Sequence, residues 1–128
     1  MTERTTPSHD LAAQERGHDV NASDRDFADL GLPDDLLKAV TDMGYETPTA
    51  IQREAIPVLL AGQDVVGVAQ TGTGKTAAYV LPIISQLSRG GYPQDAINAV
   101  IMAPTRELAQ QIDQQIDGFT YFVSVSAV

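Results

Sequence analysis

Four residues near the middle of the chain have the types and spacing that bind phosphate. Gly72, Gly74, Lys75 and Thr76 belong to the stretch AQTGTGKT, residues 69–76. Glycines let the backbone turn its N–H groups toward an anion, a lysine reaches the β- and γ-phosphates, and a threonine hydroxyl can bind Mg²⁺. The pattern predicts a nucleoside-triphosphate site in which Lys75 and Thr76 are the catalytic residues.

One position departs from the strict phosphate-loop pattern G-x-x-x-x-G-K-[ST]. Ala69 stands where that pattern has its first glycine. The context still favours a phosphate loop, because an apolar run precedes the stretch and a helical pattern follows it. The N-terminus of that helix would add partial positive charge. The alternative is a glycine-rich turn with a solvated Lys75.

The elements around this loop predict an α/β fold. Apolar or alternating runs predict strands at residues 64–69, 98–104 and 121–128, and helical patterns cover residues 32–44, 49–62, 75–88 and 105–116. Pro57 is expected to kink or restart its helix, and Pro82 to bend the next one. Strands that alternate with helices predict a parallel sheet with flanking helices.

Composition limits the kinds of protein that this chain can be. Its 128 residues fit one domain, and 43% of them are hydrophobic, enough for a packed core. The chain has no cysteine and two histidines, which argues against a thiolate or histidine metal site. A net charge of -9 requires any nucleic-acid contact to be local. No apolar run is long enough for a membrane helix, so a cytoplasmic protein is expected.

Three ordered motifs resemble those of the DEAD-box RNA helicase family. GYETPTAIQ (residues 44–52) resembles its Q motif, AQTGTGKT its Walker A motif and PTRELA (residues 104–109) its motif Ia, although Ala50 stands where the Q motif often has proline. Phe27 lies 17 residues before Gly44, where the family has an isolated aromatic residue. The resemblance covers about residues 27–128.

The resemblance implies a domain organisation. Residues 25–128 would be the truncated N-terminal portion of the family's first RecA-like ATP-binding domain, and thus a partial RecA-like P-loop domain. Residues 1–24 are polar, lack periodicity and contain no aromatic side chain. They are therefore expected to form a disordered tail.

The resemblance also implies an ATP site with Mg²⁺ as a cofactor. Gln52 offers an amide that suits the adenine edge and would favour ATP over GTP; the alternative is a capping box with Thr49. Phe27 would pack on the base or be an ordinary core residue, and Tyr45 fits packing better than ligand binding. The candidate ATP-binding residues are Phe27, Tyr45, Gln52, Ala69, Gln70, Thr71, Gly72, Thr73, Gly74, Lys75 and Thr76, with Thr76 as the Mg²⁺ ligand.

Pro104, Thr105 and Arg106 are the candidate RNA-binding residues. Thr105 can cap the helix that follows it. A basic residue in the first turn opposes the helix dipole, so Arg106 is better explained as a contact to an anion than as a stabilising residue. In the family this segment contacts the RNA backbone, which implies little sequence preference. The alternative for Arg106 is a surface ion pair.

The function implied by the resemblance is ATP hydrolysis coupled to RNA duplex unwinding or remodelling by a longer protein. These residues contain no D-E-A-D sequence, and that motif supplies the family's Mg²⁺-holding carboxylate. The chain alone is therefore expected to be inactive and to lack the strands that would flank residues 64–69. Two alternatives stay open: a P-loop NTPase outside the helicases, and a non-catalytic nucleotide- or RNA-binding module. The sequence indicates no protein partner.

Overall fold

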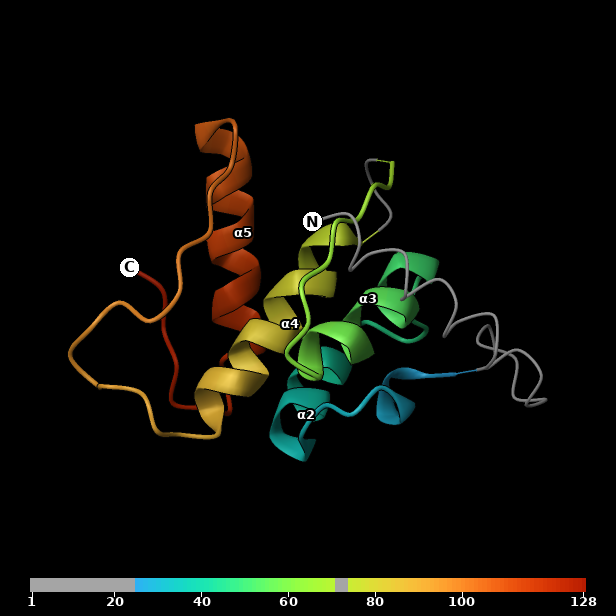
Figure 1. Cartoon of the computed structure of the whole chain (residues 1–128), viewed down its shortest axis with the longest axis horizontal. Helices are drawn as coiled ribbons and strands as arrows, with labels where there is room; N and C mark the ends of the chain where they lie inside the picture. The colour runs from blue at the N-terminus through green and yellow to red at the C-terminus, as the bar shows by residue number, and fades with distance from the viewer. Residues whose placement is uncertain (1–24, 71–73) are drawn as a thin grey trace.

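The computed structural model describes residues 25–70 and 74–128. The predicted tail at residues 1–24 and the candidate residues Thr71, Gly72 and Thr73 lie outside this part of the chain. The described elements are the 3₁₀ helix η3 (Phe27–Asp29) and the α-helices α2 (Asp34–Asp42), α3 (Ala50–Leu60), α4 (Lys75–Ser88) and α5 (Arg106–Phe119). Helix α4 lies between α3 and α5 and packs on both, and α2 packs on α5 (Figure 1).

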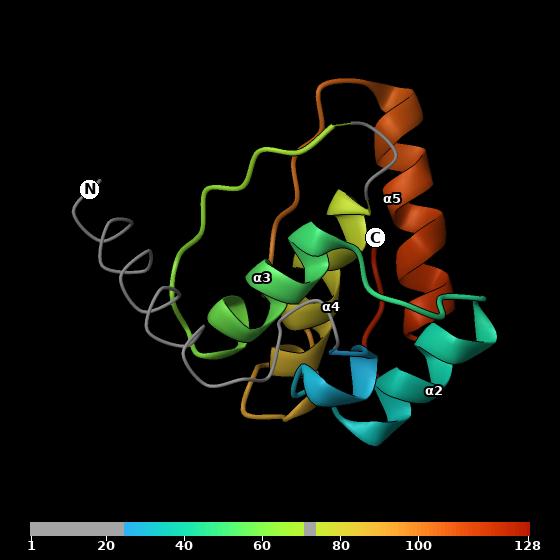
Figure 2. The ribbon, with the colours of Figure 1, turned by 90° about the vertical axis from the view of Figure 1, so that its right-hand side faces the viewer.

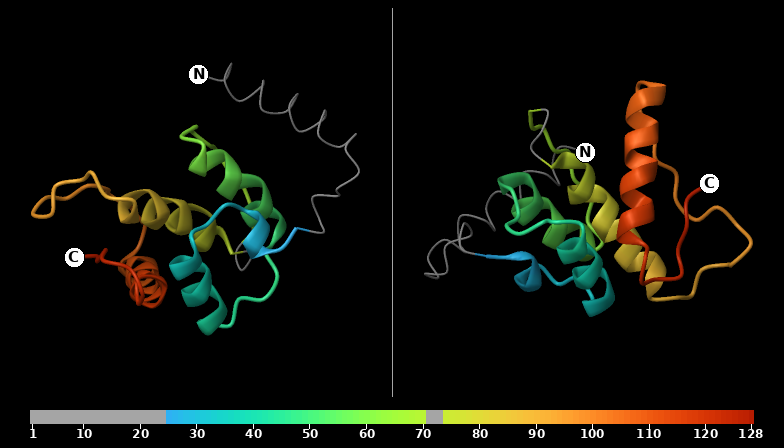
Figure 3. Two further views of the ribbon diagram at one scale, coloured as in Figure 1. Left: turned by 90° about the horizontal axis from the view of Figure 1, so that it is seen from below. Right: turned by 180° about the vertical axis from the view of Figure 1, so that it is seen from behind.

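The hydrophobic core is built around α4. Its buried residues Ala77, Val80, Leu81 and Ile84 have the i, i+3, i+4, i+7 spacing of one helical face. Figure 3 shows the other helices gathered around α4 in two further views. The rest of the core cluster comes from those elements and the segments between them: Phe27, Leu30, Leu32, Leu36, Val40, Ile56, Ile112 and Phe119.

Helix boundaries follow the capping residues that the sequence pattern identified. Thr49 and Gln52 form both hydrogen bonds of a capping box, so this prediction for α3 is confirmed. The Thr105 hydroxyl accepts a hydrogen bond from a first-turn N–H of α5. Helix α2 ends before Gly44, whose φ of 89° is readily adopted by glycine.

Two features of the helices differ from the sequence pattern. Pro57 lies inside the continuous helix α3, so it does not restart that helix; Pro82 lies inside the continuous helix α4, and the kink at Pro57 and the bend at Pro82 stay predictions. The mutual packing of α3 and α4 helps to offset the hydrogen bond that each proline removes. Helix α5 extends three residues past its predicted end at Ile116, because Phe119 is fully buried in the core.

The predicted parallel sheet, and with it the α/β class, is wrong for the part of the chain that the structure describes, where every regular element is helical. The three predicted strand segments run as coil, as Figure 2 shows for the segments before α4 and α5. Val66 is 78% exposed, Val68 92% and Val100 76%. Within the described ranges no backbone hydrogen bond joins these segments. A strand needs a neighbour for its N–H and C=O groups, and alternation of apolar residues does not supply one.

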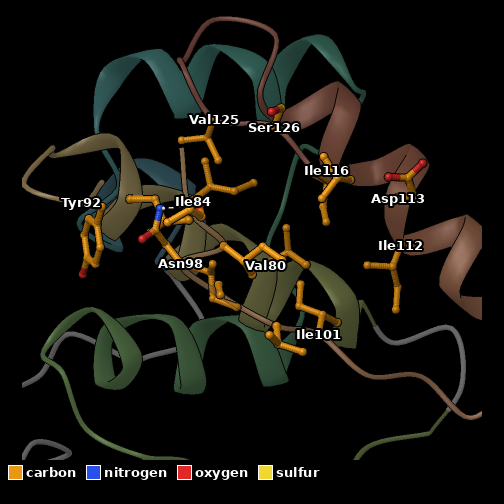
Figure 4. A pocket seen from close by; sticks show the side chains of 18 of the residues that line it. Val80, Ile84, Tyr92, Asn98, Ile101, Ile112, Asp113, Ile116, Val125 and Ser126 are labelled. Atoms are coloured by element: carbon orange, nitrogen blue, oxygen red, sulfur yellow. Dashed lines mark hydrogen bonds between the residues drawn. The ribbon is translucent and has the colours of Figure 1, made fainter. Parts of the chain in front are cut away.

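A hollow of about 770 Å³, lined by both apolar and polar side chains, lies beside the predicted strand segments at residues 98–104 and 121–128. It is lined by one side of α4, one side of α5 and the coils at residues 92–101 and 124–128. Figure 4 shows Val80 and Ile84 of α4 and Ile112 and Ile116 of α5 around it, together with Ile101. Val80, Ile84 and Ile112 thus belong to the hydrophobic core and also border this hollow, and the described residues provide no sheet on that side.

A buried hydroxyl in α4 generates a stability prediction. Ser85 is fully buried, and its Oγ has no hydrogen-bond partner among the described residues. We expect Ser85→Ala to leave the free energy of unfolding unchanged or to raise it by up to about 1 kcal/mol, because it removes an unsatisfied polar group. Urea unfolding followed by circular dichroism measures the change.

The neighbouring Ile84, which is 2% exposed, provides the matched control. Ile84→Val should lower the free energy of unfolding by about 1 kcal/mol through the cavity that it leaves. A loss of stability in Ser85→Ala as large as that in Ile84→Val would show that the hydroxyl has a partner in solution.

Candidate functional site

The N-terminus of α4 carries the described end of the predicted phosphate loop. Gly74 is the N-cap residue at φ 81°, in the left-handed region, and has no side chain with which to cap the helix. Lys75 is the first helical residue and is exposed, and Thr76 follows it half-buried. The first-turn N–H groups and the partial positive charge of a 14-residue helix therefore lie beside the lysine, an arrangement that suits an anion.

Gln52 joins the N-terminus of α3 to this loop. Its Oε1 accepts a hydrogen bond from the Thr49 N–H at 2.9 Å, and its Nε2 donates to the Gly74 carbonyl at 3.0 Å. The side chain is only 2% exposed. A Cβ at position 74 would overlap the Gln52 amide nitrogen, so this approach requires glycine at that position. The Gln52 amide thus holds Gly74 of the predicted phosphate loop against α3.

The predicted contact between Gln52 and adenine stays a prediction. The capping interpretation is confirmed, and the amide also has a second internal partner. One Nε2 hydrogen and one Oε1 lone pair remain, which is the donor and acceptor pair that an adenine edge needs. At 2% exposure, a base could reach them only if neighbouring groups moved.

Of the two candidate aromatic residues, Phe27 lies in the core and the half-buried Tyr45 packs against it. Phe27 is 5% exposed and meets Tyr45 edge-to-face, with ring centroids 6.2 Å apart. This burial agrees with the core interpretation of Phe27, and its stacking on a base stays a prediction. The Tyr45 ring also meets Phe119 of α5 at 5.5 Å, and its hydroxyl donates to Gln115 Oε1 at 3.4 Å. Burial raises the pKa of the Tyr45 hydroxyl above its ordinary value of 10.0, so the group is a donor at neutral pH.

The candidate RNA-binding residues lie at the N-terminus of α5. Pro104, Thr105 and Arg106 are all exposed, with Thr105 capping the helix and Arg106 as its first residue. No ion pair joins Arg106 to an acidic residue of the described ranges, so the surface ion-pair alternative has no support there. Figures 1 and 3 show the N-termini of α4 and α5 at the same end of the molecule. The structure therefore brings the candidate phosphate and RNA residues to one end.

Ala69 and Gln70 complete the described candidates and lie in the coil that leads into the loop. Residues 25–70 and 74–128 contain no cluster of three acidic or histidine side chains that could hold a metal ion. The Thr76 hydroxyl is therefore the one predicted Mg²⁺ ligand in these ranges. No helix of the described residues is long and apolar enough to cross a membrane.

Sequence reasoning missed three contributions to this region. The bond from Gln52 to Gly74 joins residues 22 positions apart. Phe119 and Gln115 of α5 contact Tyr45, which lies in the coil before α3. The spacing of Thr49 and Gln52 indicated the capping contact between these two residues, but not the hydrogen bond from Gln52 to Gly74. No local pattern signals the others, because they depend on how the helices pack.

The double role of Gln52 can be separated by two substitutions. Thr49→Ala removes only the cap and should lower the free energy of unfolding by about 1 kcal/mol. Gln52→Ala should lower it by about 1 kcal/mol more, because it also removes a buried hydrogen bond to Gly74. Urea unfolding followed by circular dichroism compares them. Equal losses in the free energy of unfolding for the two variants would show that Gln52 stabilises the chain only as a capping residue.

Comparison with known proteins agrees with these motifs. The family model described as DEAD/DEAH box helicase matches residues 49–128. The chain is 51% identical over 106 residues to the ATP-dependent rRNA helicase RRP3 of Phaeosphaeria nodorum, which covers 83% of this chain and 19% of the relative. It is 50% identical over 97 residues to the ATP-dependent RNA helicase DeaD of Haemophilus influenzae, covering 75% of this chain and 15% of that protein.

Among solved structures, the RNA helicase Prp28 from Chaetomium thermophilum bound to ADP superposes with a TM-score of 0.75 and 44% identity. The match covers 81% of this chain and 26% of that one. The backbone therefore follows part of a helicase structure even though its described coils form no strands. The chain spans about a fifth of the length of the curated relatives that it matches. Because the family model matches more than half of its residues, the chain belongs to the DEAD/DEAH box helicase family.

Proposed function

We propose that this chain is the part of an ATP-dependent RNA helicase that binds ATP with Mg²⁺ and contacts the RNA backbone. The complete protein would couple ATP hydrolysis to RNA duplex unwinding or remodelling. The observation that carries the proposal is the bond from Gln52 to Gly74, which joins a candidate adenine-reading side chain to the phosphate-binding end of α4. Two relatives are named as ATP-dependent helicases of rRNA and RNA, which supports ATP and RNA as the substrates.

Each residue of the site has a physical role in this proposal. Lys75 supplies a positive charge for the β- and γ-phosphates, and the first-turn N–H groups of α4 add partial positive charge. Gly74 allows the backbone to approach both the ligand and Gln52. The Thr76 hydroxyl would hold Mg²⁺, whose chemistry is to neutralise charge on the phosphate oxygens. Arg106, free of described ion pairs, would contact RNA phosphates from the N-terminus of α5.

The nucleotide site predicts a loss of binding in Lys75→Ala. We expect that variant to bind ATP at least about tenfold more weakly, because a hydrogen bond between a charged donor and phosphate is lost. Isothermal titration of the chain with ATP and with GTP measures the loss, and ATP should bind more tightly than GTP.

Lys38→Ala is the matched control, because the Lys38 ammonium lies over the Phe122 ring, 4.5 Å from its centroid, and not at the α4 N-terminus. Equal losses in the two variants would contradict the phosphate-loop assignment.

The RNA contact predicts a change in salt dependence. Arg106→Ala should weaken binding to different RNA sequences alike and reduce the slope of log affinity against log salt by about one, since a phosphate contact carries no base information. Fluorescence anisotropy with labelled RNA across a KCl series measures both. Arg89→Ala, at the exposed C-terminal end of α4, is the control. A loss confined to one RNA sequence would point to base readout instead.

A second candidate function is a non-catalytic nucleotide- or RNA-binding module. The absence of a D-E-A-D sequence from the 128 residues favours it for this chain by itself. An assay of phosphate release distinguishes the two. We expect no RNA-stimulated release from residues 1–128 above a Lys75→Ala control, and activity only when the carboxylates of a D-E-A-D motif are supplied.

A further inference from the structure

Tyr45 makes contacts that an ATP-binding role does not require. Its ring meets Phe27 at 6.2 Å and 65° and Phe119 at 5.5 Å and 70°, both in edge-to-face geometry. Its hydroxyl lies 3.4 Å from Gln115 Oε1, a long distance for a hydrogen bond between oxygens. Both Phe119 and Gln115 belong to the C-terminal part of α5. The Tyr45 ring therefore attaches one end of α5 to the segment before the α3 capping box.

Arg106 lies at the opposite end of the same helix. Helix α5 runs from Arg106 to Phe119, so these residues are about 20 Å apart at the usual rise per residue. Its N-terminal half has little support, because residues 106–111 are exposed except for the half-buried Leu108. One side of the helix lines the hollow of about 770 Å³, where the described chain leaves space beside Ile112 and Ile116 (Figure 4). The orientation of α5 therefore depends on the contacts of its C-terminal half.

We propose that Tyr45 is a positioning residue that sets the orientation of α5 and thereby places Arg106 for its contact with RNA. The inference rests on the proposed RNA contact of Arg106. A tilt of about 5° at the Tyr45 end would move the far end of a helix of this length by about 2 Å. That displacement is several times the distance range of a guanidinium–phosphate hydrogen bond, so Arg106 would have to change its side-chain conformation to keep the contact.

A double-mutant cycle between Tyr45 and Arg106 tests the proposal. Residues so far apart normally have additive effects, so a lack of additivity is diagnostic of coupling through the helix. The probe is a fluorescein-labelled oligouridylate, titrated with the chain across a KCl series and followed by anisotropy. Tyr45→Leu should weaken binding by about fivefold and flatten the salt slope as Arg106→Ala does. The double variant should bind no more weakly than Arg106→Ala alone.

Two further variants separate positioning from general stability. Tyr45→Phe keeps both ring contacts and loses only the long hydrogen bond, so RNA affinity should stay within about twofold of the parent chain. Tyr79→Leu removes a half-buried tyrosine from α4 and is the matched control, whose effect should add to that of Arg106→Ala. Additive effects for Tyr45→Leu as well would overturn the positioning role.

A distance measurement tests the same role without RNA. The chain has no cysteine, so Glu54→Cys on α3 and Gln110→Cys on α5 can be spin-labelled uniquely. Tyr45→Leu should shift or broaden the distance distribution between the labels, and Tyr79→Leu should not. An unchanged distribution in Tyr45→Leu would overturn the inference. If Arg106→Ala leaves RNA affinity unchanged while the distribution shifts, the proposed RNA contact fails and the positioning of α5 by Tyr45 stands.

Discussion

Burial of one face of α4 is the interaction on which the rest of the described structure depends. Ala77, Val80, Leu81 and Ile84 belong to one core cluster with apolar side chains of η3, α2, α3 and α5. Full burial of each large aliphatic side chain contributes about 1.5–3 kcal/mol, about twice the worth of a single cap or hydrogen bond. Packing therefore sets the position of α4, and the capping contacts refine it. Since Lys75 begins this helix, the core also sets the position of the proposed phosphate-binding end.

Two polar contacts then determine the geometry at that end of the molecule. The Gln52 amide connects α3 to Gly74, and Thr105 caps α5 beside Arg106. Each contact is worth about 1 kcal/mol, and both restrict where a candidate functional backbone or side chain can lie. Glycine is required at position 74 because a Cβ there would overlap the Gln52 amide. Because the Gln52 side chain is buried, a base could reach its amide only if neighbouring groups moved.

The coils at the predicted strand positions show how a correct local pattern can lead to a wrong fold class. Val65, Val66 and Val68 have the composition of a buried strand, and the chain follows a helicase structure with a TM-score of 0.75. The described residues nevertheless give these valines no partner, and all three are exposed. Strand formation depends on backbone groups elsewhere in the chain, so residue type at the strand itself does not decide it. Helices satisfy their own backbone groups, which is why each predicted helix is present.

The sequence by itself determined the four α-helices, the caps of α3 and α5, and the identity of the residues that could do chemistry. Thr49, Gln52 and Thr105 were predictable as capping residues because a cap is a contact between residues two or three positions apart. The glycines, Lys75 and Thr76 were recognisable because phosphate chemistry restricts residue types at short spacing. Only the tertiary structure decided that Gln52 bonds to Gly74, that Tyr45 lies between Phe27 and Phe119, and that the apolar segments have no strand partner within residues 25–70 and 74–128. Each of these features depends on residues that are far apart in the chain. The packing of the helices around α4 brings such residues together, and no local sequence pattern specifies it.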